Sequence, residues 1–240
     1  GDGPTGLTRS NLASNLYTYT VADAKGCPLS GDINITEPAQ AFSLSHVQTD
    51  VKCFGDATGS ITLTQSGGTT PYATPQWLDL AVGITRNGLA AGTYIAIDSD
   101  ANGCLDSLHI LITQPNSAFA AAKASTNVLC NGGTSGTATL TLSGGTTPYG
   151  TVSWSDAGSG TSRTGLAAGQ YGYTVSDANL CKDTGTIVIT EPTKFTIQED
   201  SVNVKCKGLP TGSITLTPSG GTTPYGTVTW GDGPTGLTRS

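Results

Sequence analysis

The stretch Thr137–Trp154, TATLTLSGGTTPYGTVSW, decides the fold class. Apolar and polar residues alternate in Thr137–Leu142, as in a strand that buries one face. Ser143–Tyr149, SGGTTPY, is predicted to be a loop, because its glycines permit positive φ angles and its proline leads into the next strand. Gly150–Ser155 is predicted to be that strand and carries Trp154.

The residues that follow continue the same pattern. Tyr171, Tyr173 and Val175 alternate within Gly169–Val175, and Thr186–Thr190 is predicted to be a strand that turns Ile187 and Ile189 inward. No segment shows a convincing helical period. Six or seven short strands with frequent turns predict an all-β fold, a two-sheet antiparallel sandwich of immunoglobulin-like type.

This unit is repeated along the chain. SGGTTPY occurs three times, in steps of 77 and 76 residues, and a tryptophan follows each copy at Trp77, Trp154 and Trp230. Identity at a fixed spacing is typical of a tandem array. The predicted domains are a C-terminal half repeat at 1–38, complete repeats at 39–115 and 116–192, and an N-terminal half repeat at 193–240.

The same decapeptide, GDGPTGLTRS, stands at Gly1–Ser10 and at Gly231–Ser240. Continuing the chain from Ser240 into Asn11 would complete one repeat from the two halves. We therefore expect the chain to be a window of a longer array with a higher-order period of 230 residues, and each half to be an incomplete fold.

The six cysteines form two series at the repeat spacing. The first series is Cys53, Cys130 and Cys206, and the second series is Cys27, Cys104 and Cys181. Within each complete repeat, a cysteine of the first series lies 51 residues before one of the second, which predicts the disulfides Cys53–Cys104 and Cys130–Cys181. Reduced, buried thiols are the alternative. When the chain is continued from Ser240 into Asn11, Cys206 also lies 51 residues before Cys27. These two cysteines are therefore predicted to pair across the two ends of the chain. Closing a loop of this length with a disulfide would stabilise a small domain by roughly 4 kcal/mol. Paired cysteines also indicate an oxidising compartment.

Composition argues against several classes of function. The formal net charge is −6 and the basic residues do not cluster, so a nucleic acid is not an expected partner. The longest apolar runs are too short to span a bilayer. Nucleophile, phosphate-loop and zinc-protease motifs are absent, and neither His46 nor His109 recurs at the repeat spacing. We expect no enzyme activity, no cofactor and no metal.

The segment Asp98–Gly103, DSDANG, resembles the first half of an EF-hand loop, although position twelve is His109 rather than glutamate. A turn between strands is favoured, and calcium binding stays open. Asp98 itself stands where Val175 stands in the next repeat. Either the strand ends earlier there, or Asp98 is exposed.

Most aromatic residues recur at identical positions in alternating strands, which favours core packing over a carbohydrate-binding platform. Three tyrosines next to proline in the SGGTTPY loops are the expected exposed set and the candidate binding residues: Tyr72, Tyr149 and Tyr225.

Taken together, V-x-C-x-G, G-S-I-T-L-T, S-G-G-T-T-P-Y, G-L-A-A-G-T-Y, D-A-N-G-C and I-T-E-P give the chain a pattern that resembles the SprB repeat, found in very large cell-surface adhesins of gliding Bacteroidota. That resemblance implies export by the type IX secretion system and an extracellular, cell-surface location. It also implies O-glycosylation of Asp-Ser/Thr-aliphatic triplets, which Ser107 and Ser201 fit.

The expected function is that of a structural stalk or filament segment, which extends an adhesin from the cell and bears force in adhesion and gliding. The alternative is a repeated module that grips polysaccharide or a solid surface. The expected partners are neighbouring repeats of the same chain, with surface polysaccharide or a solid substratum as further partners.

Overall fold

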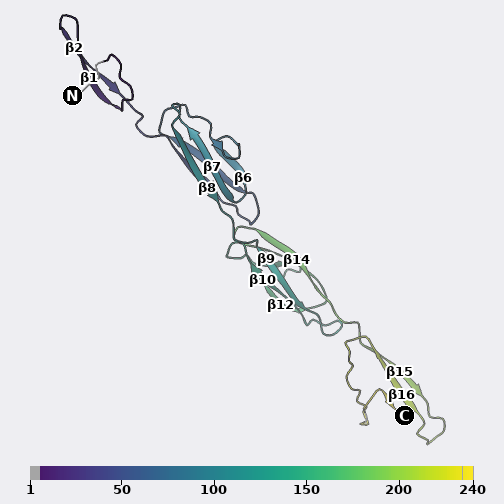
Figure 1. Ribbon diagram of the computed structural model, residues 1–240. Helices are drawn as coiled ribbons and strands as arrows, with labels where there is room; N and C mark the ends of the chain where they lie inside the picture. Colours follow the sequence, from purple (N-terminus) through teal and green to yellow (C-terminus); the bar gives the residue numbers. More distant parts are fainter. Residues whose placement is uncertain (1–5, 234, 240) are drawn as a thin grey trace. The chain divides into compact units, whose positions relative to one another are not determined.

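The computed structural model describes residues 6–233 and 235–239, which form strands and no helix (Figure 1). Contacts divide the chain into two compact units. The first comprises residues 1–51 and 57–113, and the second comprises residues 52–56 and 114–240. The short segment 52–56 thus belongs by its contacts to the second unit, although the repeat pattern of the sequence assigns it to 39–115.

The first unit holds one hairpin and one sandwich. The hairpin pairs β1 with β2, and the sandwich consists of two three-stranded antiparallel sheets in the orders β3-β4-β6 and β5-β7-β8. The strands are β1 (Asn15–Ala22), β2 (Pro28–Ile35), β3 (Ser43–Thr49), β4 (Gly59–Ser66), β5 (Gln76–Trp77), β6 (Thr85–Leu89), β7 (Gly92–Ser99) and β8 (Leu105–Ile112).

The second unit repeats this sandwich and adds a single sheet. Its sheets have the orders β9-β10-β12, β11-β13-β14 and β15-β16-β17. The strands are β9 (Ala120–Thr126), β10 (Gly136–Ser143), β11 (Ser153–Trp154), β12 (Ser162–Leu166), β13 (Gly169–Ser176), β14 (Lys182–Ile189), β15 (Thr196–Val202), β16 (Ser213–Ser219) and β17 (Thr238–Arg239).

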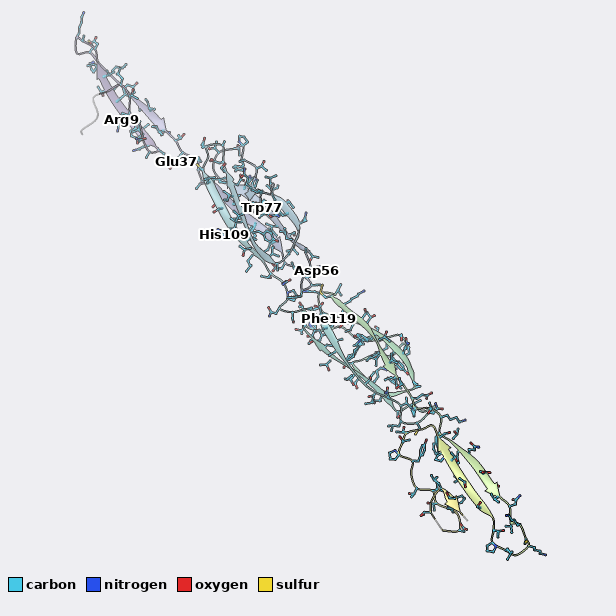
Figure 2. The ribbon with its side chains drawn as sticks, turned by 45° about the vertical axis from the view of Figure 1, so that its right-hand side comes forward. Arg9, Glu37, Asp56, Trp77, His109 and Phe119 are labelled. Carbon is cyan, nitrogen blue, oxygen red and sulfur yellow. A yellow bond between two sulfur atoms is a disulfide. The ribbon has the colours of Figure 1, made fainter. Side chains whose placement is uncertain are left out.

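A core lies between the two sheets of each complete repeat. In the first unit, Ile61 of β4 and Ile110 of β8 are buried in one cluster with Trp77, which Figure 2 labels among the strands of its repeat. The Trp77 indole donates a hydrogen bond to the Gly83 carbonyl, so its polar edge is satisfied inside the fold. The second unit has the equivalent cluster, with Ile187 and Ile189 turned inward. The predicted all-β sandwich repeat is therefore confirmed.

Two local predictions were wrong. The strand predicted over Gly150–Ser155 covers only Ser153–Trp154, and the amide of Gly150 instead donates to the Ser176 carbonyl. Strand β12 was not predicted, because Ser162–Leu166 lacks apolar alternation. It forms at the edge of its sheet, where it pairs with β10.

Neither expectation for Asp98 holds. Strand β7 continues to Ser99, and Asp98 is only 4% exposed. Its carboxylate accepts hydrogen bonds from the side-chain amide of Gln65 and from the Ser99 amide. In the next repeat, the positions of Gln65 and Asp98 are held by Leu142 and Val175. A polar pair in one repeat therefore replaces an apolar pair in the other.

The segments before β3 and after β14 each form a single sheet. The hairpin β1-β2 corresponds to β7-β8, and the sheet β15-β16-β17 corresponds to β3-β4-β6. Val21 is 47% exposed, whereas its counterpart Val175 is 2% exposed in a complete sandwich. The division of the chain into two halves and two complete repeats at the stated boundaries stays a prediction.

Candidate functional site

Each cysteine of the second series follows a turn that an aspartate holds in place. In the turn before β14, one carboxylate oxygen of Asp177 accepts the amides of Asn179 and Cys181, both at 2.9 Å. The other oxygen accepts the amide of Thr146 at 2.8 Å, from the SGGTTPY loop. Asp177 is 2% exposed, so the turn, the loop and the position of Cys181 are fixed together.

The turn before β8 is built in the same way. Asp100 accepts the amides of Asn102, Cys104 and Thr69. These hydrogen bonds lower the pKa of Asp100, and the bond from the Cys104 amide has the largest effect. The charge of Asp100 in turn raises the pKa of the Cys104 thiol. The carboxylate of this turn is thus used in holding the backbone.

The predicted calcium alternative gains no support from this turn. His109, at the twelfth position of the EF-hand pattern, lies exposed on β8. Over residues 6–233 and 235–239, no group of three or more histidine, cysteine or acidic side chains could hold a metal ion.

Cys53 and Cys130 of the first series each lie in a loop held by the residue before proline in the pair Gln114-Pro115 or Glu191-Pro192. The side chain of Gln114 accepts the amide of Gly55 at 2.8 Å, beside Cys53. In the next repeat, the carboxylate of Glu191 accepts the amide of Gly132 at 2.6 Å, beside Cys130. The pair therefore does more than end a strand, because it fixes the cysteine loop at the same end of its repeat.

A disulfide joins Cys53 to Cys181, with their Cα atoms 5.7 Å apart and a separation of 128 in sequence. Both cysteines lie in the second compact unit, because the segment 52–56 belongs to it. The side-chain amide of Asn179 donates to the Lys52 carbonyl at 2.9 Å, next to the disulfide. In sequence terms, a first-series cysteine is bonded to a second-series cysteine of the following repeat.

The predicted pairs Cys53–Cys104 and Cys130–Cys181 were wrong, and Cys104 and Cys130 are free and exposed. The reason is geometric. The amide of Val51, just before Cys53, bonds the Thr113 carbonyl beyond the end of β8, whereas Cys104 stands before the start of β8. An eight-residue strand spans about 26 Å, and a disulfide needs Cα atoms about 4.4 to 6.8 Å apart.

The candidate binding tyrosines pack against the fold. Tyr72 and Tyr149 are half-buried rather than exposed, and Tyr225 is 36% exposed. The ring of Tyr149 lies 5.2 Å from that of Phe119, and its hydroxyl donates to the Gly144 carbonyl at 2.9 Å. Tyr72 and Tyr225 make the equivalent contacts. These tyrosines brace the SGGTTPY loops, and of the expected exposed set only Tyr225 is exposed.

A cluster of charged and aromatic side chains, not predicted from the sequence, recurs in both complete repeats. Arg163 forms two hydrogen bonds to Asp156 and lies over the rings of Trp154 and Tyr171. Arg86 repeats this arrangement with Asp79, Trp77 and Tyr94. The sequence does contain a pattern that could have predicted this cluster: an aspartate stands seven residues before an arginine, and the pair recurs at the repeat spacing. The cluster ties the segment after the tryptophan to the sandwich.

The predicted glycosylation residues lie on strand surfaces. Ser107 is exposed on β8 and Ser201 is exposed on β15. Their modification stays a prediction. Among the residues described, no helix is long and apolar enough to cross a membrane.

Comparison with solved structures finds two segments of the surface layer protein SbsC. Domains 4–9 match with a TM-score of 0.27 and 12% identity, covering 85% of this chain and 38% of that one. Domains 1–6 match with a TM-score of 0.30 and 11% identity, covering 90% and 48%. This chain thus spans less than half the length of either, and likenesses this low carry no functional argument. The search of curated proteins found no match.

The SprB repeat family model matches three segments, 45–80, 122–158 and 198–235. Each begins in the first strand of its repeat and ends just after the tryptophan, so the matches follow the spacing seen in the sequence and in the strands. The chain is therefore a repetitive protein that carries SprB repeats.

Proposed function

We propose that this chain is a stalk segment of a large extracellular adhesin, which extends it from the cell surface and bears force during adhesion and gliding. The observation that carries the proposal is the disulfide between Cys53 and Cys181. It covalently links two successive repeats of the sequence, which a force-bearing array needs more than a ligand-binding one does.

The chemistry of the chain supports this role. The features that recur in both complete repeats, namely the tryptophan, the arginine cluster and the aspartate turn, are all engaged in holding the fold. The tyrosines that would have formed a repeated binding surface are packed against phenylalanines. This weighs against the ligand-binding alternative.

The disulfide has a specific mechanical consequence. When the two ends of the chain are pulled, the covalent path passes from Cys53 directly to Cys181. The sequence between them, a separation of 128 residues, is therefore protected from extension. Fully extended, that length of chain would contribute about 430 Å.

Single-molecule pulling between the chain ends tests the proposal. Under oxidising conditions, we expect the fully unfolded chain to be about 430 Å shorter than after reduction. Cys53→Ser should behave like the reduced chain under both conditions. Cys104→Ser is the matched control and should behave like the unaltered chain.

Two results would count against the stalk. One is an extension under oxidising conditions equal to that of the reduced chain. The other is unfolding of the oxidised repeats at forces so low that the array would extend before it could transmit a load.

A further inference from the structure

The cysteines that remain free lie in local structures like those of the two that are bonded. At Cys206 the carbonyl accepts the amide three residues later, from Leu209, as the carbonyl of Cys53 does from Asp56. Cys130 lies in a loop held by Glu191, as Cys53 lies in a loop held by Gln114. The Cys130 carbonyl accepts the Gly133 amide, as the Cys53 carbonyl accepts the Asp56 amide. Cys130 therefore presents an exposed thiol at the same end of its repeat as Cys53 does.

The second-series cysteines show the same equivalence. The amide of Cys104 bonds Asp100 as that of Cys181 bonds Asp177, and Cys27 bonds Asp23 in the same way.

Asn102 adds an independent observation. The side-chain amide of Asn179 donates to Thr146 Oγ1 at 3.0 Å and to the Lys52 carbonyl beside Cys53. The side-chain amide of Asn102 makes the first of these bonds, to Thr69 Oγ1 at 3.0 Å. The Asn102 side chain therefore has the orientation of Asn179, in which its amide can donate to a backbone carbonyl of the cysteine loop of a preceding repeat.

From these equivalences we propose that Cys27, Cys104, Cys130 and Cys206 are each one half of the same inter-repeat disulfide. The partner of each is the complementary cysteine of an adjoining SprB repeat. The bonded pair is 128 residues apart, and the chain described here has no residue at that separation in the required direction from any of the four. Their free state thus follows from the pairing rule.

The pairing rule is directional. A first-series cysteine bonds forward to the following repeat, and a second-series cysteine bonds backward to the preceding one. Each bond forms when two thiols lose two protons and two electrons to a disulfide oxidant such as oxidised glutathione, which is reduced to two thiols. The rule depends on the geometry of the boundary and holds whether or not the array serves as a stalk.

A tandem chain, residues 1–240 followed directly by residues 11–240, tests this rule because it joins two copies through their shared decapeptide. After refolding with oxidised glutathione, non-reducing peptide mapping should find Cys53–Cys181 in each copy. It should also find Cys130 bonded to Cys27 of the second copy, and Cys206 bonded to Cys104 of the second copy.

Matched serine variants sharpen the result. Cys27→Ser in the second copy should leave Cys130 of the first copy fully accessible to a maleimide and leave the other bonds intact. Cys27→Ser in the first copy should change no bond. The Cys53–Cys181 peptide reports in every variant that the complete repeats have folded.

A bond between Cys206 and Cys27 of the second copy, which is the pairing within one repeat, would overturn the proposal. A Cys130 thiol that stays free while Cys53–Cys181 forms would overturn it as well. Neither outcome would change the result of the pulling experiment on the single chain. The pairing rule and the stalk function can therefore be disproved independently.

Discussion

Single residues show how far one repeat can depart from another without losing the fold. Gln65 and Asp98 form a hydrogen-bonded pair at the place where Leu142 and Val175 stand in the next repeat. A buried carboxylate is tolerated there because its donor lies on the neighbouring sheet of the same sandwich. The burial of Asp98 could not be predicted from its own position, because the residue that compensates for it is 33 positions away.

The pair predicts strong coupling between the two positions. Gln65→Leu should destabilise the repeat by about 3 kcal/mol, because it leaves the carboxylate of Asp98 buried without that donor. Asp98→Val should cost only about 1 kcal/mol, since the Gln65 amide still donates to the Ala73 carbonyl. The double variant reproduces the pair of the next repeat and should recover most of the stability. Denaturant unfolding of the four chains measures the coupling, and additive effects would contradict it.

The ion pair between Asp156 and Arg163 predicts an acid-dependent loss of stability. The hydrogen bonds from Arg163 lower the pKa of Asp156 from its ordinary 3.8 to about 2. A depressed pKa means that the stabilising effect is present above pH 4 and is lost as the pH falls from about 4 to about 2. Asp156→Asn should lower the melting temperature at pH 6 and flatten its fall between pH 4 and pH 2. Parallel curves for the two chains would contradict this.

Elements of the fold were predictable where one face is buried and the other is exposed. Strands β10, β13 and β14 show regular alternation, with Ala138 and Leu140 turned into the core. Strand β12 could not be predicted, because Ser162–Leu166 is mostly polar and its pairing with β10 comes from tertiary contact. The short strand β11 likewise forms through tertiary contact rather than through a pattern in its own sequence. Its tryptophan is fixed by a hydrogen bond to the Gly160 carbonyl rather than by a long ladder.

A glycine of the SGGTTPY loop and a glycine of the turn between β11 and β12 should differ in what a side chain costs. Gly144 has a φ of 69°, and a Cβ atom there would overlap the backbone carbonyl of Ala118. Gly160 also has a positive φ, 87°, but a Cβ atom there would meet nothing within 4 Å. Gly160→Ala should therefore cost about 1 kcal/mol, and Gly144→Ala more than about 3 kcal/mol. Denaturant unfolding compares them, and equal losses would show that the overlap is relieved without cost.

At the scale of the whole molecule, the pairing of the cysteines could not be read from the sequence. Because the chain is periodic, a partner 51 residues away in the same repeat and a partner 128 residues away in the next are the same kind of position. What separates them is the length of β8, which places the two cysteines of one repeat at opposite ends of the sandwich. The periodicity itself, the sandwich and the core tryptophans were all predictable.

The disulfide also changes what a single cut in the backbone can do. A protease that cleaves the chain anywhere between Cys53 and Cys181 leaves the two fragments joined through sulfur. If every boundary carries the same bond, successive bonds overlap, because each spans more than one repeat. Any one peptide bond would then be bypassed by a neighbouring bridge. Such an array would be a covalent network with redundant connections. Its two ends would separate only after three backbone cuts in successive stretches between cysteines, or after one cut combined with reduction of every bridge that spans it.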